Sequence, residues 1–214
     1  MSRFTILLGG DLTPTPRLAA QVTGTRVIAA DAGIRHAQML GLVPELWVGD
    51  FDSVPSRLEG GLSNVERRTF PKEKDQTDGE LAVTEALSRG ATSLLIAGAF
   101  GGPRFDHSFL HVTLAIRLAE QGIDVMLTSG AQEGTPLSPA MQSFDYDDAT
   151  VFSVLGLTQL DGLSVEGARW PLKAVQVPFG SSWTVSNEVR GALRASLSKG
   201  RAMLLAHPYP AEGF

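Results

Sequence analysis

The sequence predicts an α/β domain with a mostly parallel sheet, followed by an all-β domain built as an antiparallel β-sandwich. Short apolar runs alternate with helix-like segments over residues 1–132, and the stretch GAQEGTPLSP at residues 130–139 interrupts this pattern. From there onward, short alternating runs recur between turns at a spacing of about 8–12 residues, which is typical of a sandwich or barrel. We therefore expect one domain at residues 1–132 and a second at residues 133–214.

The elements of the first domain follow from their apolar patterns. Strands are expected at the apolar runs of residues 4–8, 26–30, 45–48, 65–70, 93–97 and 124–128. Helical spacing predicts helices at residues 33–40, 77–88 and 107–120. Thr77 and Glu80 match the capping-box pattern, so the middle helix should begin near Thr77. Because strands alternate with helices, we expect crossover connections between parallel strands.

The composition is that of an ordinary globular protein. The chain has 214 residues, of which 43% are apolar and 19% charged, and its net charge of −5 disfavours a general nucleic-acid binder. The absence of cysteine excludes disulfides, thiolate metal sites and a cysteine nucleophile. No apolar run approaches the roughly 18 residues of a membrane span. We therefore expect a cytoplasmic protein with neither nucleic-acid nor membrane partners.

Charged residues follow the expected strands at the ends where ligands bind in an open parallel sheet. They are Asp11, Asp31, Asp50, Asp52, Lys74, Asp75, Asp78, Arg104 and Asp106. A structural role, in a turn or as a helix cap, explains a single Asp such as Asp11 or Asp31 as well as a functional role does. Asp50 and Asp52 fit that explanation less well, since crowded carboxylates repel each other unless a cation compensates. Together with Asp75 and Asp78 they predict a site for a hard divalent ion, best Mg²⁺.

Two further stretches suggest phosphate binding. PKEKDQTDGE places Lys72 and Lys74 before the carboxylates of Asp75 and Asp78, which are three residues apart and can face the same way in a first helical turn. GAFGGPRFDH is a Gly-rich loop before a helix, where phosphate oxygens can approach backbone N–H groups, and Arg104 could bind phosphate as a fork. Each stretch also has a purely structural explanation: the first can be a solvated, charged helix start, and the second an ordinary Gly-rich turn.

Taken together, these motifs resemble the thiamine pyrophosphokinase family. The resemblance rests on AADAG at residues 29–33, VGDFDS at 48–53, KDQTD at 74–78 and GGPRFDH at 101–107. It continues with Trp170 in RWPL and with Ser186 and Asn187 in TVSNEV, and so spans nearly the whole chain. The pair GDFDS and KDxTD is specific, whereas either motif alone is less so.

The resemblance implies transfer of a diphosphate group from ATP to the hydroxyl of thiamine, giving thiamine diphosphate and AMP. It also implies Mg²⁺, an α/β nucleotide domain, a β-sandwich that binds thiamine, and a homodimer whose subunits share the active site. The metal-binding and catalytic residues would be Asp50, Asp52, Asp75 and Asp78. The nucleotide would be bound by Asp31, Lys74, Thr77, Gly101, Gly102, Arg104 and Asp106. Thiamine would be bound by Trp170, Ser186 and Asn187.

The chain departs from the family pattern at several positions. Pro103 is an extra residue before Arg104 and could shift where Arg104 reaches, and His111 stands where Asn is usual. Ala32, Arg35 and His36 replace a frequent Gly, Asn and Arg. His107 could touch the nucleotide or cap the following helix, and we expect the cap.

The tryptophans are assigned separately. Trp170 should offer an aromatic face to the thiamine cation, with packing between the sheets as the alternative. Ser186 and Asn187 should hydrogen-bond the pyrimidine. Trp183 lies outside the family motif and is expected to be structural, and Trp47 to lie in the core.

Three other functions remain open at this point. A pyrophosphokinase could act on another alcohol such as a pterin, because the fold does not fix the substrate. A non-catalytic protein could bind thiamine or a nucleotide, and a metal-dependent phosphoesterase would also use clustered aspartates.

Overall fold

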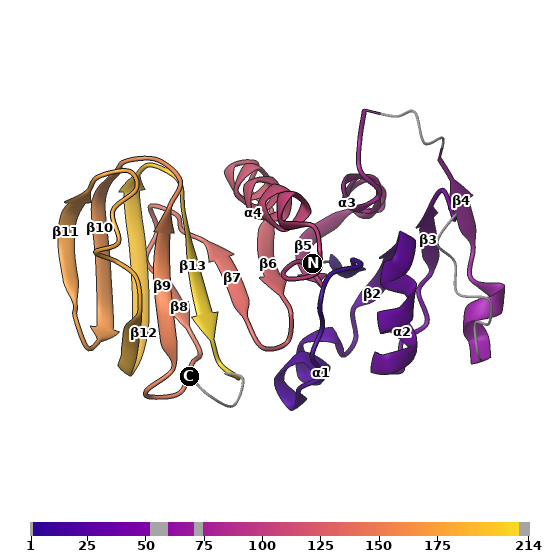
Figure 1. Cartoon of the computed structure of the whole chain (residues 1–214), viewed down its shortest axis with the longest axis horizontal. Helices are drawn as coiled ribbons and strands as arrows, with labels where there is room; N and C mark the ends of the chain where they lie inside the picture. Colours follow the sequence, from indigo (N-terminus) through magenta and orange to yellow (C-terminus); the bar gives the residue numbers. More distant parts are fainter. Residues whose placement is uncertain (1, 52–59, 71–74, 210–214) are drawn as a thin grey trace.

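The structure is a computed structural model that describes residues 2–51, 60–70 and 75–209. Asp52, Lys72 and Lys74 therefore lie outside the described residues. The two halves of the chain lie end to end along the long axis of the molecule, with the helices gathered in the first half (Figure 1). Within the described ranges, no helix combines the length and the apolar character that crossing a membrane requires.

A parallel sheet organises the first half, in the spatial order β6-β5-β1-β2-β3-β4. Its strands are β1 (Ser2–Leu7), β2 (Arg26–Ala30), β3 (Leu46–Gly49), β4 (Arg67–Thr69), β5 (Ala91–Ala97) and β6 (Asp124–Thr128). From β1 the chain moves outward through β2, β3 and β4, and it then returns to β5 and β6 on the other side. Such a reversal beside β1 opens a crevice beyond the carboxyl ends of the strands, where ligands bind in sheets of this kind.

Alternate residues of the central strands face two different cores. Phe4 and Ile6 of β1 belong to the core that also holds α3 (Asp78–Ser88) and α4 (Phe105–Glu120). Leu7 belongs to the opposite core with α2 (Ile34–Leu40), where Trp47 is also fully buried, as expected. Because helices cover both faces, the strands read as continuous apolar runs in the sequence.

Two helix starts show how local sequence sets the elements. Thr77 caps α3 as predicted, because its hydroxyl accepts a hydrogen bond from the Glu80 N–H at 3.3 Å and the Glu80 carboxylate accepts one from the Thr77 N–H at 3.2 Å. Helix α1 (Pro16–Val22) was not expected from its apolar pattern. Its signal is the pair Thr15 and Pro16, a hydroxyl cap followed by proline at the first helical position.

The second half is antiparallel and contains no helix among its described residues, which confirms the predicted fold class. Its strands are β7 (Glu133–Pro136), β8 (Gln142–Phe144), β9 (Val151–Gly156), β10 (Leu160–Ala168), β11 (Leu172–Val177), β12 (Asn187–Lys199) and β13 (Ala202–His207). These strands enclose a separate core that includes Phe152, Leu163 and Val189. Strand pairing nevertheless continues across residues 132 and 133, because β7 pairs with both β6 and β13.

A buried carboxylate joins the two halves beside this junction. Glu133 is 1% exposed, and its two oxygens accept hydrogen bonds from Arg17 of α1 at 2.8 and 3.2 Å. Gln21 donates a third hydrogen bond to the same carboxylate at 2.7 Å. The Arg17 guanidinium also lies 4.9 Å from the ring centroid of Tyr146 in the second half. The ion pair therefore connects α1, β7 and the segment before β9.

Replacing Glu133 with Gln should lower the free energy of unfolding by about 2–3 kcal/mol, because Arg17 then lacks its anionic partner next to a buried amide. Glu120→Gln is the matched control, since Glu120 binds Arg201 with the same two-bond geometry, at 2.7 and 3.2 Å, on an exposed surface. That change should cost less than about 1 kcal/mol. Chemical denaturation measures both, and equal losses would contradict the assigned role of Glu133.

Candidate active site

A cavity of about 830 Å³ lies beyond the carboxyl ends of the parallel strands, at the chain reversal beside β1. We call it the sheet cavity. Its walls are the segments that follow β1, β2 and β3 and those that precede α3 and α4. In Figure 1 the arrows of β3 and β4 point toward the edge on which these segments lie. The described residues that line it include Gly9, Gly10, Asp31, Asp50, Thr77, Asp78, Gly101, Gly102, Arg104, His107 and His111.

Close backbone packing forms the floor of the sheet cavity. A Cβ atom on Gly10 would lie 2.4 Å from the carbonyl oxygen of Gly98, so only glycine fits between the loops after β1 and β5. Asp11 ties these loops together, because its Oδ2 atom accepts a hydrogen bond from the Gly102 N–H at 2.9 Å. Asp11 is thus a loop residue that positions the Gly-rich segment.

Two side chains of α2 hold the loop after β1 from below. Arg35 donates to the carbonyl oxygens of Gly9 and Gly10 at 2.6 and 3.2 Å. His36 is buried, and its Nε2 atom lies 2.9 Å from the Gly10 oxygen. Burial lowers the pKa of His36, which favours the neutral ring that donates this bond. The sequence reasoning missed this role, although both residues lie within three positions of the end of the AADAG motif.

Three carboxylates reach the sheet cavity from different elements. Asp31 follows β2 with a left-handed backbone (φ 43°), Asp50 follows β3, and Asp78 is the first residue of α3. Asp75 is exposed, precedes the helix and does not line the cavity. Within the part of the chain that the structure describes, no three Asp, Glu or His residues group closely enough to hold a metal ion. The predicted set with Asp52 extends beyond the described residues and stays a prediction.

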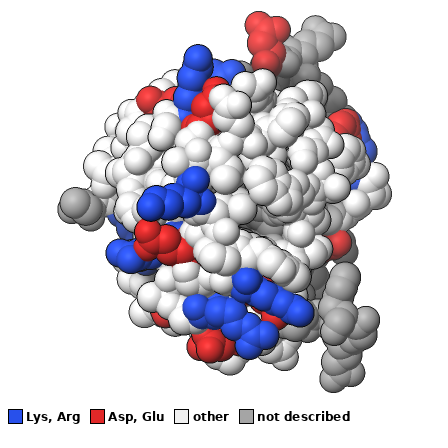
Figure 2. Space-filling model, turned by 90° about the vertical axis from the view of Figure 1, so that its left-hand side faces the viewer, with Lys and Arg blue, Asp and Glu red and all other residues white. Residues whose placement is uncertain are grey.

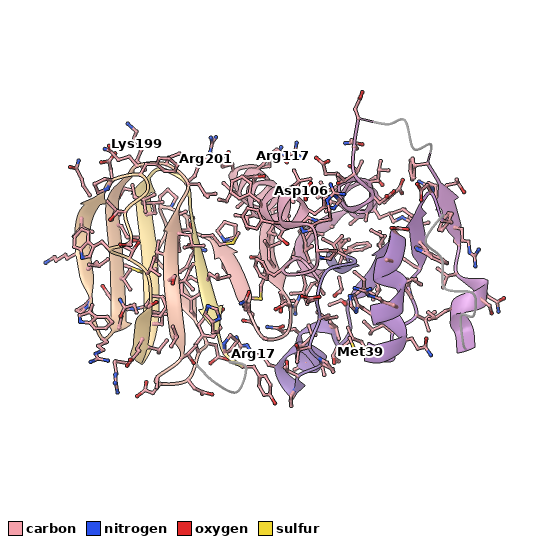
Figure 3. All side chains as sticks on the ribbon, in the orientation of Figure 1. Arg17, Met39, Asp106, Arg117, Lys199 and Arg201 are labelled. Carbon is pink, nitrogen blue, oxygen red and sulfur yellow. The ribbon has the colours of Figure 1, made fainter. Side chains whose placement is uncertain are left out.

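Arg104 lines the sheet cavity, but its guanidinium is already held by a neighbour. It donates to both carboxylate oxygens of Asp106 at 2.9 and 2.6 Å, and this bond lowers the pKa of Asp106 to about 2. Asp106, labelled in Figure 3, does not line the cavity itself. Asp106 therefore orients Arg104, and its predicted direct contact with a nucleotide lacks support from this geometry.

The two histidines of α4 also face the sheet cavity. His107 lies in the first helical turn and does not cap the helix as expected, since Arg104 is the N-cap residue and makes no side-chain capping bond. His111 lies one turn further, and its Nδ1 atom is 2.9 Å from the Ala99 oxygen. Burial lowers the pKa of His111, so the neutral ring is favoured near pH 7.

A second cavity of about 330 Å³ lies in the antiparallel half, and we call it the aromatic cavity. Its apolar walls are Phe152, Val154, Val165, Leu172 and Val185. Trp170 and Trp183 also line it, with 53% and 57% of their surfaces exposed. Packing of Trp170 between the sheets is thereby excluded. The expectation that Trp183 is a structural residue is wrong as well, because it faces solvent and the cavity.

Asn187 and Ser186 position Trp170 and its surroundings. The Asn187 Oδ1 atom accepts hydrogen bonds from the N–H groups of Trp170 and Glu188 at 3.1 and 2.9 Å, and its Nδ2 atom donates to the Trp170 carbonyl at 2.8 Å. Ser186 does not line the cavity, and its N–H donates to Ser153 at 3.0 Å. The side-chain amide of Asn187 thus fixes the turn that presents Trp170.

The two cavities lie toward opposite edges of the chain. β10 runs antiparallel to β12, so Asp161 pairs with Lys199, and Trp170 lies beyond the other end of β10. Lys199 and Arg201 share the upper edge of Figure 3 with Asp106, whereas the β10 arrow points to the lower edge in Figure 1. Trp170 is therefore displaced from the edge where Asp106 and Arg104 lie.

Comparison with known proteins identifies the family. The model described as thiamin pyrophosphokinase, catalytic domain, matches residues 22–127, which include Asp31, Asp50, Asp78 and Arg104. The model described as thiamin pyrophosphokinase, vitamin B1 binding domain, matches residues 143–201, which include both tryptophans of the aromatic cavity. The chain belongs to the thiamin pyrophosphokinase family.

Individual members of this family resemble the chain over most of its length. The thiamine pyrophosphokinase of Bacillus subtilis (strain 168) is 26% identical over 196 residues, covering 88% of this chain and 90% of the relative. A crystal structure of thiamine pyrophosphokinase from Bacillus subtilis has a TM-score of 0.84 at 24% identity, covering 97% of this chain and 100% of that one. A thiamin pyrophosphokinase family protein from Enterococcus faecalis has a TM-score of 0.79 at 26% identity, with 96% and 99% coverage.

Proposed function

We infer that this chain transfers a diphosphate group from ATP to the hydroxyl of thiamine, giving thiamine diphosphate and AMP. The observation that carries this proposal is the pairing of a carboxylate-lined sheet cavity with an aromatic cavity in one member of this family. The match of residues 143–201 to a vitamin B1 binding domain favours thiamine over a pterin. It equally disfavours a simple phosphoesterase, which has no need of such a domain.

The sheet cavity is the proposed site for ATP. Gly10 and Gly101 line this cavity on loops that pack too closely for a side chain, and the start of α4, where backbone N–H groups can bind phosphate oxygens, faces the same space. Asp106 holds the Nε and Nη2 edge of the Arg104 guanidinium, so Arg104 would bind phosphate through Nη1 and the second N–H of Nη2. Asp31, Thr77 and Gly102 line the same cavity and would contact the nucleotide. Lys74 is a further nucleotide-binding residue that we propose from the sequence. The Gly102 N–H is bound to Asp11, so this glycine serves close approach rather than donation.

The oxygen donors of the sheet cavity suit Mg²⁺, since carboxylates and water are the ligands this ion prefers. Asp50 and Asp78 would hold the ion, with Asp52 and Asp75 as the further ligands proposed from sequence. When bound, Mg²⁺ neutralises the phosphate oxygens and aligns them for in-line attack. The protein supplies position and charge, and a carboxylate of this cavity takes the proton that the thiamine hydroxyl loses.

The positions of the two cavities support our proposal of a homodimer with a shared site. The hydroxyl must approach the β-phosphorus closely, yet the cavities lie toward opposite edges of one chain. A second copy that sets its aromatic cavity against the sheet cavity meets this need. Phe105, Phe109 and Phe179 are 80%, 49% and 70% exposed and provide apolar surface for such a contact.

The cytoplasmic location expected from the sequence also stays a prediction.

Incubation of the purified protein with ATP, MgCl₂ and thiamine should release AMP in step with thiamine diphosphate. Omitting thiamine should abolish AMP release, because the diphosphate then lacks its acceptor. Chromatography of the nucleotides separates AMP from ADP. Release of ADP or free phosphate, or AMP release that does not depend on thiamine, would contradict the proposed reaction.

A further inference from the structure

We propose that Trp183 forms a second aromatic wall of the thiamine site and makes that site selective for flat, cationic rings. The proposal rests on the proposed function, and it assigns a role to a residue outside the motifs shared with the family. Trp183 and Trp170 come from different segments, the loop between β11 and β12 and the turn between β10 and β11. Both line the aromatic cavity.

The exposure of Trp183 is built into the local structure. Its neighbour Thr184 is buried, and its hydroxyl donates a hydrogen bond to the Val154 carbonyl at 2.7 Å. The backbone carbonyl of Thr184 accepts a hydrogen bond from the Val154 N–H at 2.8 Å. The Trp183 N–H donates to the Ser181 hydroxyl at 3.2 Å. The backbone on which Trp183 stands is thus tied to β9. An indole held in this way over an apolar cavity, with 57% of its surface exposed, offers a large binding face.

The polar groups of the aromatic cavity are largely used within the protein. Thr184 donates its hydroxyl to Val154, and both acceptor positions of the Asn187 Oδ1 atom are taken by backbone N–H groups. The remaining walls are aliphatic or aromatic. Recognition in this cavity therefore depends mainly on ring faces, which bind flat rings and attract a cation through their quadrupole.

The residues around Trp170 explain why this tryptophan alone does not suffice to bind a cationic ring. The Arg169 guanidinium lies 4.7 Å from the Trp170 ring centroid and so occupies one face of that indole. Its charge is paired with Glu188 at 2.9 Å, and Glu188 also binds Arg190 at 3.0 Å. Figure 2 shows basic and acidic side chains close together on this end of the molecule. Among the residues that the structure describes, no cation lies over Trp183 as Arg169 does over Trp170, and Trp183 lines the aromatic cavity with more than half of its surface exposed.

Trp183→Leu tests the proposal, because leucine keeps apolar surface and removes the π face. The thiamine KM of this variant should rise about 3- to 30-fold, the range expected for a lost cation–π contact, while the ATP KM stays unchanged. Trp183→Phe should fall between the wild type and Trp183→Leu. An unchanged thiamine KM in Trp183→Leu would overturn the proposal.

Intrinsic fluorescence gives a second readout that does not depend on catalysis. Of the three tryptophans, Trp47 is fully buried, so Trp170→Phe leaves Trp183 as the exposed emitter. Thiamine should quench the emission of this variant, and emission that stays constant up to millimolar thiamine would contradict the proposal. If the wild type forms no AMP while thiamine still quenches Trp183, the proposed function fails and the cavity assignment stands.

Discussion

Asp50→Asn should lower the rate of diphosphate transfer by about 100-fold or more and leave the fold intact. The change removes one negative charge from the carboxylates of Asp31, Asp50 and Asp78, which share the sheet cavity. A divalent ion bound to ATP is then held less firmly, and its alignment of the phosphates is lost. Since crowded carboxylates repel each other, the melting temperature should hold or rise.

Asp124→Asn is the matched control for this prediction. Asp124 begins β6 at the opposite end of the sheet, where it accepts a hydrogen bond from Ser93 at 3.0 Å. The same chemical change there should leave both activity and melting temperature nearly unaffected. Near wild-type activity in Asp50→Asn, at saturating Mg²⁺ and ATP, would remove Asp50 from the proposed metal site.

Two inactive variants should restore activity to each other when they are assembled together. Asp50→Asn disables the sheet cavity, and a Trp170→Ala, Trp183→Ala double change disables the aromatic cavity. In a mixed dimer with shared sites, one site combines both defects and the other is intact. Random assembly should therefore yield about a quarter of the wild-type rate, since half of the dimers are mixed.

Co-expression with two different affinity tags isolates the mixed dimer for this measurement. Sedimentation of the wild type at micromolar concentration should show a dimer. If each chain held a complete site, the mixed species would be as inactive as its parents, because every chain carries one defect. That result, or a fully active monomer, would reject the shared site.

The fold was largely predictable because both sides of the first sheet are covered. The predicted bounds of β2 and β6 equal the observed Arg26–Ala30 and Asp124–Thr128, since strands packed on two faces stand out as apolar runs between polar turns. Helix α1 buries only Leu18 and Val22, so its apolar pattern shows one i, i+4 pair and no repeat, whereas α2, of the same length, repeats at Ile34, Ala37 and Leu40. Its cap pair was the available signal.

The site was less predictable, because its details depend on contacts between distant residues. Asn187 bonds the backbone of Trp170, 17 residues earlier, and no spacing rule reveals such a pair. Trp183 lies in the run SSWTV, whose alternation indicates a strand, yet this segment is a loop that carries the indole to the aromatic cavity. Patterns predict elements well, but they do not say where a loop directs one side chain.

The pairing of β7 with both β6 and β13 has a mechanical consequence. Many kinases close two lobes around a hinge to exclude water and bring their substrates together. A sheet that passes from one half to the other without a flexible linker resists such bending, and the Glu133 ion pair braces the same junction. In the proposed dimer each chain would then be rigid, with its nucleotide cavity in one half and its thiamine cavity in the other. The way in which two chains assemble, rather than closure of the two halves of one chain, would set the distance between the donor phosphate and the thiamine hydroxyl.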